Sequence, residues 1–147
     1  MHAPAPNYDT GSPVNLQYAS STSSQQTSSG NWTPLAGLSI QVPPANDFMT
    51  SALVFLCVPM SYATGNDFPG TNFAIEANGA VVAVGGYTYD SSTPQSSGRH
   101  PITLIAQIPL GSDWTTVQGM WSTVRGGTSH IDSFISLSAI MAAPPHP

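Results

Sequence analysis

The chain has 147 residues, a length that fits one domain, and it carries two arginines, no lysine and seven acidic residues. Its formal net charge is −5, and charged residues make up only 6% of the sequence, against roughly 25% in an average globular domain. Nucleic acids and anionic membrane surfaces require many more cationic side chains than two, so we expect neither as a partner. Ser, Thr, Asn, Gln and Gly must cover most of the surface, as is common in extracellular β proteins.

Cys57 is the single cysteine, so no internal disulfide is possible, and its place in the apolar run 52–58 predicts a buried thiol. The first residues lack the basic start and apolar core of a signal peptide. No apolar run approaches the roughly 20 residues of a membrane helix. We therefore expect a soluble protein without membrane insertion, located outside the cell or at the cell surface by a non-classical route.

The N-terminal part, residues 1–31, is polar, and residues 20–30 consist only of Ser, Thr, Gln and Gly. Such a stretch buries too little apolar surface to offset the entropy lost on ordering it. We therefore expect a flexible polar arm over 1–31. Leu16 and Tyr18 are among the few side chains that could dock part of it onto the body.

From Trp32 onward the pattern predicts strands and turns rather than helices. Leu35–Val42 alternates as a half-buried strand does, and Asn78-Gly79 between two apolar runs predicts a hairpin. The run 52–58 is apolar at every position, so both of its faces need cover, and a second subunit could supply one of them.

Later segments continue this pattern, with strands expected over 102–108, 115–124 and 131–141. Short strands at roughly 8–12-residue spacing indicate an all-β sandwich or jelly roll. We place this domain at 32–142 and a Pro-rich tail at 143–147.

The two arginines, Arg99 and Arg125, each lie where a strand meets a loop, a common place for binding groups. The planar donors of a guanidinium suit the vicinal hydroxyls of a sugar, and an aromatic face can cover its apolar side. The alternative is a structural salt bridge for each arginine, with Asp132 or Asp90 as partner. The pattern alone does not decide between the two.

His130, Asp132 and Ser133 are the residue types of a hydrolase triad. Adjacent strand residues point to opposite faces, however, so His130 and Asp132 would share one side and Ser133 the other. The sequence also lacks the Gly-x-Ser-x-Gly turn that exposes such a nucleophile. The histidines show no metal-ligand spacing and the carboxylates are not clustered, so we expect no metal and no cofactor.

Several strings occur in one order along the chain: 61–70, 73–75, 88–89, 97–99, 122–126 and 130–133. They resemble the TNF-like, fucose-binding lectin family of the N-terminal domain of the Burkholderia cenocepacia superlectin. The likeness is collinear from about Tyr62 to Ile140, weaker over 35–60 and absent over 1–31. The resemblance implies a TNF-like jelly-roll sandwich, assembled as a homotrimer with three fucose sites, each at a subunit interface.

The resemblance also implies which residues contact the sugar. One subunit would hydrogen-bond fucose through Thr88, Ser97 and Arg99. The neighbouring subunit would contribute Tyr62, Arg125 and Ser133.

Two more residues receive roles from the resemblance. Tyr89 would form an apolar wall for the methyl group of fucose, and Asp132 would orient Arg125 or Tyr62.

This chain departs from the family at positions toward the sugar beyond fucose. It has Asn72 in place of a tyrosine, Val84 in place of an aspartate and Gln95 in place of a glutamate. With Ser96, these residues are candidates for a secondary site, and they leave the preferred oligosaccharide open.

We therefore predict a lectin domain that recognises fucose and blood-group-type fucosylated oligosaccharides, without catalysis. One alternative is a non-catalytic trimeric assembly module without sugar binding. Another is a hydrolase that uses His130 and Ser133.

Overall fold

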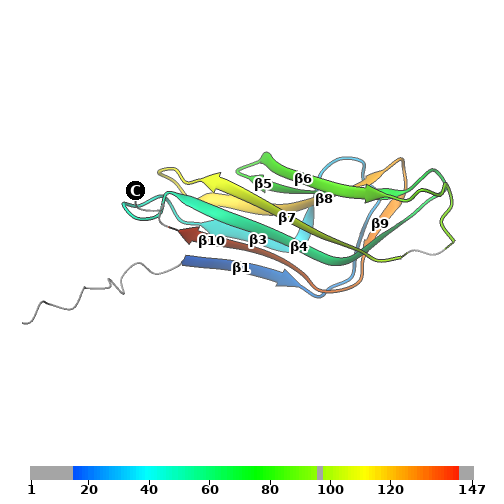
Figure 1. Cartoon of the computed structure of the whole chain (residues 1–147), viewed down its shortest axis with the longest axis horizontal. Coiled ribbons are helices and arrows are strands. Elements are labelled where there is room, and N and C mark those ends of the chain that lie inside the picture. The colour runs from blue at the N-terminus through cyan, green and yellow to red at the C-terminus, as the bar shows by residue number, and fades with distance from the viewer. Residues whose placement is uncertain (1–14, 96–97, 143–147) are drawn as a thin grey trace, which may run out of the picture.

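The computed structural model describes residues 15–95 and 98–142, in which the chain forms ten β-strands and no helix (Figure 1). The strands are β1 (Asn15–Ser21), β2 (Gln25–Thr27), β3 (Thr33–Val42), β4 (Ser51–Thr64), β5 (Gly70–Ala77), β6 (Ala80–Thr88), β7 (His100–Pro109), β8 (Thr115–Val124), β9 (Thr128–Ile131) and β10 (Ile135–Ala142). A helix able to cross a membrane is therefore not found in the described ranges.

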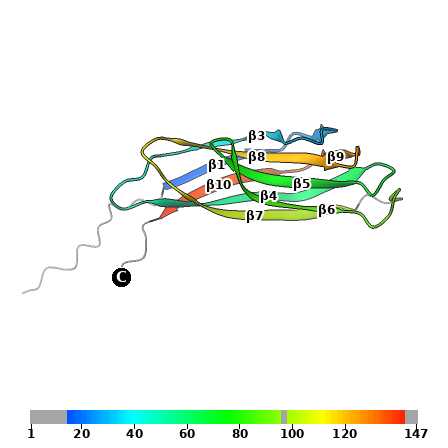
Figure 2. The same cartoon turned by 90° about the horizontal axis from the view of Figure 1, so that it is seen from above.

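The strands form two antiparallel sheets that lie face to face (Figure 2). One sheet has six strands, in the order β1-β10-β4-β9-β2, with β7 also paired to β4. The other has four, in the order β3-β8-β5-β6. Because the chain crosses repeatedly between the sheets, this is the expected all-β jelly-roll sandwich.

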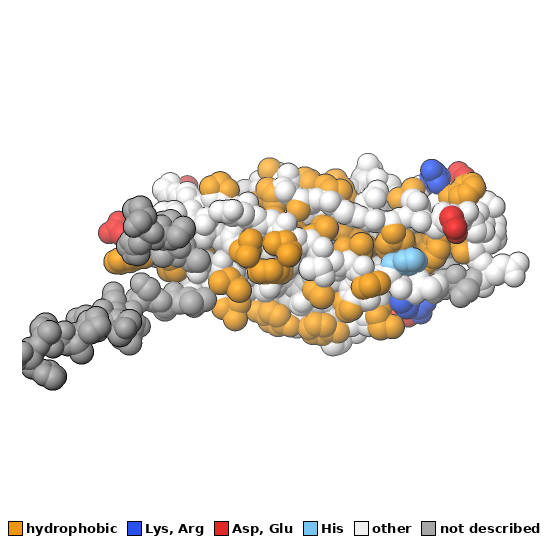
Figure 3. All heavy atoms as spheres, viewed as in Figure 1, with side chains coloured by type: hydrophobic (Ala, Val, Ile, Leu, Met, Phe, Trp, Pro, Cys, Tyr) orange, Lys and Arg blue, Asp and Glu red, His pale blue; other side chains and the backbone are white. Residues whose placement is uncertain are grey.

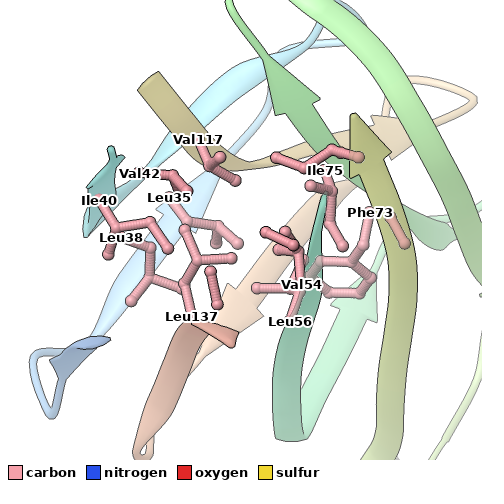
Figure 4. Packing of buried hydrophobic residues seen from close by; sticks show 14 of the residues in the cluster. Leu35, Leu38, Ile40, Val42, Val54, Leu56, Phe73, Ile75, Val117 and Leu137 are labelled. Carbon is pink, nitrogen blue, oxygen red and sulfur yellow. The ribbon is translucent and has the colours of Figure 1, made fainter. Parts of the chain in front are cut away.

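The core lies between the sheets and is built from alternate residues of facing strands (Figure 4). Val54 and Leu56 of β4 and Leu137 of β10 meet Phe73 and Ile75 of β5, and all five are fully buried. Such burial is the main favourable term for a chain that has no disulfide and few charges.

The expectation of a flexible arm over 1–31 is wrong for its described part. Asn15–Ser21 forms β1, which pairs along its full length with β10, and Gln25–Thr27 forms β2, which pairs with β9. Backbone hydrogen bonds hold these polar segments in the sheet without an apolar pattern in the sequence. Residues 1–14 and the predicted tail 143–147 lie outside the described residues.

β4 has two apolar faces, as its sequence predicts. Ala52, Val54, Leu56 and Val58 point into the core, whereas Leu53 remains 41% exposed on the outside of the sheet. Phe55 and Cys57 also point outward and are half-buried, so the prediction of a buried thiol is wrong. The thiol lies outside the core because Cys57 alternates with the buried Leu56 and Val58.

The outside of the six-stranded sheet gathers large apolar side chains, visible on the face shown in Figure 3. The register aligns Leu16, Ile140 and Leu53 in one row across β1, β10 and β4. The next row aligns Tyr18, Phe55 and Ile105. We call this surface the outer apolar face; its exposed members are Leu16, Tyr18, Leu53, Ile105 and Ile140.

The predicted hairpin is confirmed: Asn78 and Gly79 link β5 to β6 with φ of 49° and 80°. The predicted single strand over 131–141 is wrong, because residues 132–134 separate β9 from β10. β9 pairs with the part of β4 from Ser61 onward and β10 with the part before Val58. The interruption therefore lies opposite a bulge in β4, between Val58 and Ser61, where the register shifts.

Candidate functional site

Most of the predicted site residues lie at one end of the sandwich, on the right of Figure 1, where β4, β6 and β8 end and β7 begins. Gly70 pairs there with both Thr88 and Val124, and Ser61 pairs with His100. The loops at this end come from distant parts of the sequence. Strand pairing therefore brings their side chains together.

The centre of the site is a stack on the outside of the six-stranded sheet. Tyr62 of β4 lies directly opposite His130 of β9, and their rings stack with centroids 4.5 Å apart and an interplanar angle of 8°. The Cζ atom of Arg99 lies 3.8 Å from the centroid of the Tyr62 ring. Its Nη2 donates to Oδ2 of Asp132 at 2.5 Å. Tyr62, Arg99, Asp132 and His130, which we call the Arg99 cluster, thus form one connected group.

The salt-bridge partner of Arg99, which the sequence left open, is Asp132. The expected role for Asp132 was to orient Arg125 or Tyr62, but its observed ionic partner is Arg99. The side chains of Arg99 and Asp132 are 33% and 38% exposed. A surface ion pair of this kind contributes little to folding stability, so its main effect is to fix the direction of the guanidinium.

His130 remains neutral more readily than an ordinary histidine. Burial lowers its pKa, the positive charge of Arg99 lowers it further, and the carboxylate of Asp132 opposes these effects. Nε2 of His130 lies 3.0 Å from Oγ1 of Thr64 on β4. A neutral ring stacked on Tyr62 avoids repulsion with the nearby guanidinium.

A second aromatic layer lies beneath this stack, between the sheets. The Tyr87 ring stacks on His100 with centroids 4.3 Å apart, and its hydroxyl lies 3.1 Å from Oγ of Ser61. Tyr89 meets His100 edge-on at 5.0 Å, and its hydroxyl donates to the Gly98 carbonyl at 2.9 Å. Tyr89 thereby holds the residue that precedes Arg99. Burial raises the pKa of both tyrosines, which keeps their hydroxyls protonated as donors.

Arg125 occupies a different position at the same end. It lies in the turn between β8 and β9 with φ of 51°, next to Gly126, and Gly127 N donates to Val124 O at 3.2 Å. Nη1 of Arg125 donates to the carbonyl of Phe68 at 3.3 Å, and its Cζ lies 5.6 Å from the Phe68 ring centroid. Among the described residues of one chain, Arg125 thus contacts Phe68 and not the Arg99 cluster.

The remaining predicted residues are divided between the sheets. Thr88 alternates with Tyr87 and so faces the outside of the four-stranded sheet, as do Asn72 and Val84. Gln95 is exposed in the loop after β6, and Ser96 and Ser97 lie outside the described residues.

Ser133 follows Asp132 in the break between β9 and β10. Its Oγ is buried and has no hydrogen-bond partner in the described part of the chain; the same holds for Nε2 of His100.

The resemblance implied that Tyr62 and Arg99 belong to different subunits. In the structure they are already in contact within one chain, because β4, β7 and β9 lie in the same sheet.

Sequence reasoning assigned no binding role to His130, although it correctly predicted that His130 and Asp132 share a side. It also missed His100. The sequence indicated His130 only through its spacing of two residues from Asp132, which places both on one side of a strand. Its position opposite Tyr62 depends on the pairing of distant strands. The described residues contain no group of three or more His, Cys, Asp or Glu side chains that could hold a metal ion.

The family model described as the Bc2l-C N-terminal domain matches residues 22–140, most of the chain. The chain belongs to this family. The resemblance found in the sequence is thereby confirmed. The Bc2l-C N-terminal domain model begins at residue 22, so it does not cover β1. A search of curated proteins finds no match.

Solved structures resemble this Bc2l-C-type domain at 7% to 14% identity, with TM-scores of 0.44 to 0.48. Eiger TNF from S. frugiperda is 12% identical with a TM-score of 0.48, over 92% of this chain and 96% of that one. The EclA C-terminal domain, a sugar-binding protein, is 7% identical with a TM-score of 0.44, over 79% and 78%. Dimeric latent PorU from Porphyromonas gingivalis is 14% identical with a TM-score of 0.47, over 90% of this chain. The chain spans only 14% of the PorU chain.

Proposed function

We propose that the chain is a non-catalytic lectin domain that binds fucose and fucosylated oligosaccharides at sites completed between subunits of a homotrimer. The observation that carries the proposal is the Arg99 cluster, in which a guanidinium is fixed on an aromatic ring and against a carboxylate at the protein surface. Membership of the Bc2l-C N-terminal domain family supports the same conclusion.

The chemistry of the cluster suits a deoxy-sugar. A guanidinium carries five N–H donors in a fixed plane, which match the vicinal hydroxyls of a pyranose. Asp132 fixes this plane, and the tyrosine hydroxyls supply donor–acceptor pairs. Tyr89, whose hydroxyl bonds the carbonyl of Gly98 next to Arg99, offers an apolar ring surface for the methyl group of fucose.

The location of the cluster supports a site between subunits. Tyr62 and Arg99 lie on the outside of the same sheet that carries the outer apolar face. Leu16, Tyr18 and Ile105 on that face are each more than half exposed in the single chain. Clustered exposed apolar side chains of this kind mark interaction surfaces. Packing this face against neighbouring copies would bring a second chain to the edge of the Arg99 cluster.

The neighbouring subunit would then complete the site with Arg125 and Ser133. Arg125 lies at the same end of the sandwich but away from the cluster of its own chain, as expected for a group that serves an adjacent site. Thr88 and Ser97 stay proposed contacts from the subunit that supplies Arg99; Thr88 would reach the site from the end of β6, the edge strand of the four-stranded sheet. The secondary candidates Asn72, Val84, Gln95 and Ser96 would contact sugars beyond fucose.

The two alternatives are an assembly module without sugar binding and a hydrolase. An assembly module without sugar binding is favoured by the outer apolar face alone, and would form the trimer but give no signal on a glycan array. For a hydrolase, His130 would have to activate Ser133, yet the described contacts of its Nε2 are with Thr64. We therefore retain the lectin as the proposal and the assembly module as its rival.

Isothermal titration with methyl α-L-fucoside tests the proposal directly. The wild-type protein should bind, and Arg99→Ala should abolish measurable binding while leaving the circular dichroism spectrum and the native mass unchanged. Asp47→Asn, which changes one charge in an exposed loop at the other end, is the matched control and should bind as the wild type does. Normal fucoside binding by Arg99→Ala would refute the site, and a trimer that binds no fucosylated glycan would favour the assembly module.

A further inference from the structure

A cavity of about 420 Å³ opens at the opposite end of the sandwich from the Arg99 cluster. It lies between the β5–β6 hairpin of one sheet, the end of β7 in the other, and the loop that leads into β8. Its volume falls within the roughly 300–1,000 Å³ typical of small-molecule sites. Nothing in the fucose site uses these residues.

One side of the cavity is apolar, and a bulge helps to build it. The β5–β6 register shifts between Ile75 and Glu76, which leaves Val82 as an extra, unpaired residue of β6. Val82 lines the cavity together with Ile108 and Ala77. Bulges commonly redirect a side chain in this way. An aliphatic surface of this kind can pack against the C–H face of a sugar ring.

The other side offers hydrogen-bonding groups that have no partner in the described part of the chain. Thr115 is only 7% exposed and lines the cavity, yet its hydroxyl makes no hydrogen bond there. Asp113 and Ser112 line the same cavity, and Asp113 has no ion-pair partner among the described residues. The Thr115 hydroxyl and the Asp113 carboxylate are therefore available to bond solvent or a ligand in the cavity.

The polar groups are held in place by the backbone. Asn78 N donates to Thr116 O at 2.9 Å, and Thr116 N donates to Oδ1 of Asn78 at 2.9 Å. The amide NH₂ of Asn78 can therefore donate into the cavity without cost to these bonds. The loop before β8 is anchored because Ala45 N donates to Gly111 O at 2.8 Å. The cavity is thus preformed rather than dependent on ordering of a loop.

The charge at this end selects the kind of ligand. Both arginines lie at the far end, with the Arg99 cluster and with Phe68, so carboxylates set the local charge: Asp113 in the cavity and Asp47 in the nearby β3–β4 loop. We propose that this cavity is a second binding site, for a neutral saccharide, in which Asp113, Thr115 and Asn78 bind hydroxyls and Val82 and Ile108 cover an apolar face. Anionic sugars would be repelled by Asp113. The proposal does not depend on the fucose site.

Saturation-transfer NMR on the full chain carrying Arg99→Ala separates the two sites. The probes are the methyl glycosides of glucose, galactose and mannose at millimolar concentration, with glucosamine as a cationic comparison. At least one should show transfer, and Asp113→Asn or the nearly isosteric Thr115→Val should weaken its binding roughly tenfold or more. Asp47→Asn in the same background is the control and should leave transfer unchanged.

Three results would overturn the proposal. No transfer to any of the three glycosides would show that the cavity does not bind neutral saccharides. Transfer unaffected by both Asp113→Asn and Thr115→Val would place the binding elsewhere. Transfer to glucosamine but to none of the neutral glycosides would show that Asp113 selects an amine instead. Fucoside binding by the protein with Arg99 intact is measured separately, so failure of either site can be recognised on its own.

Discussion

Tyr62 and His130 lie directly opposite each other on β4 and β9, and their rings stack nearly parallel with centroids 4.5 Å apart. This pair forms the surface on which Arg99 rests. It exists because the β4 bulge between Val58 and Ser61 turns Tyr62 outward while Ser61 remains buried. A change in this register would remove the aromatic support from the guanidinium.

Replacing Arg99 by lysine should lower the affinity for methyl α-L-fucoside roughly tenfold or more, although the charge is kept. Lysine lacks the planar donors that can engage Asp132 and a sugar together. Titration calorimetry measures the change. Asp132→Asn should weaken binding in the same direction, since the guanidinium loses its ionic partner, and equal affinities for all three proteins would contradict the assigned geometry.

Lowering the pH below the ordinary histidine pKa of 6.5 should destabilise the protein through His130. Because burial and Arg99 lower the pKa of folded His130, the unfolded chain binds more protons in this range, and stability is lost as pH falls. The midpoint of thermal unfolding should therefore drop more between pH 7 and pH 5 in the wild type than in His130→Phe, which keeps the ring stack without titrating. The other titrating groups are common to both proteins, and parallel pH curves would contradict the prediction.

Replacing Ile105 by aspartate should convert the proposed trimer to monomers without unfolding the chain. Ile105 is 58% exposed in the single chain, so its loss costs the fold little, whereas a carboxylate on the outer apolar face would be buried in an assembly. Native mass spectrometry gives the oligomeric state. Val84→Asp is the matched control, because Val84 is also 58% exposed but lies on the outside of the other sheet. A trimer of Ile105→Asp with wild-type stability would exclude this face as the interface.

Replacing Phe73 by alanine should reduce the free energy of unfolding by about 3–5 kcal/mol, since the ring is fully buried against Trp121 and the cavity would not close. Urea denaturation followed by fluorescence measures the change. Val84→Ala on the neighbouring strand should cost less than about 0.5 kcal/mol, because that side chain is largely exposed. Similar losses for both variants would contradict the assigned core.

The sequence predicted those features that a local pattern determines. Asn78-Gly79 specified its turn, and the alternation of Ile135, Leu137 and Ala139 marked the buried side of β10. The sequence analysis did not predict β1, because its large side chains, Leu16 and Tyr18, point outward and its pairing uses only the backbone.

In the candidate site too, local spacing could be read from the sequence, whereas contacts between distant strands could not. The spacing of His130 and Asp132 indicated that they share a side. The ion pair of Asp132 with Arg99, by contrast, depends on the placement of β7 beside β4 and of β4 beside β9. Such pairings join residues far apart in the chain, and no local spacing encodes them. The contact of Tyr62 with Arg99 in one chain is therefore a result of the structure alone.

Subunit complementation tests most directly whether each fucose site combines Arg99 of one chain with Arg125 of the next. Arg99→Ala and Arg125→Ala are each inactive on this account, but refolding them together in equal amounts should restore fucoside binding at about a quarter of the interfaces, where an intact Arg99 meets an intact Arg125. Calorimetry of the mixed trimers gives the number of sites. Absence of any restored binding, with mixed trimers confirmed by native mass spectrometry, would contradict a site shared between subunits.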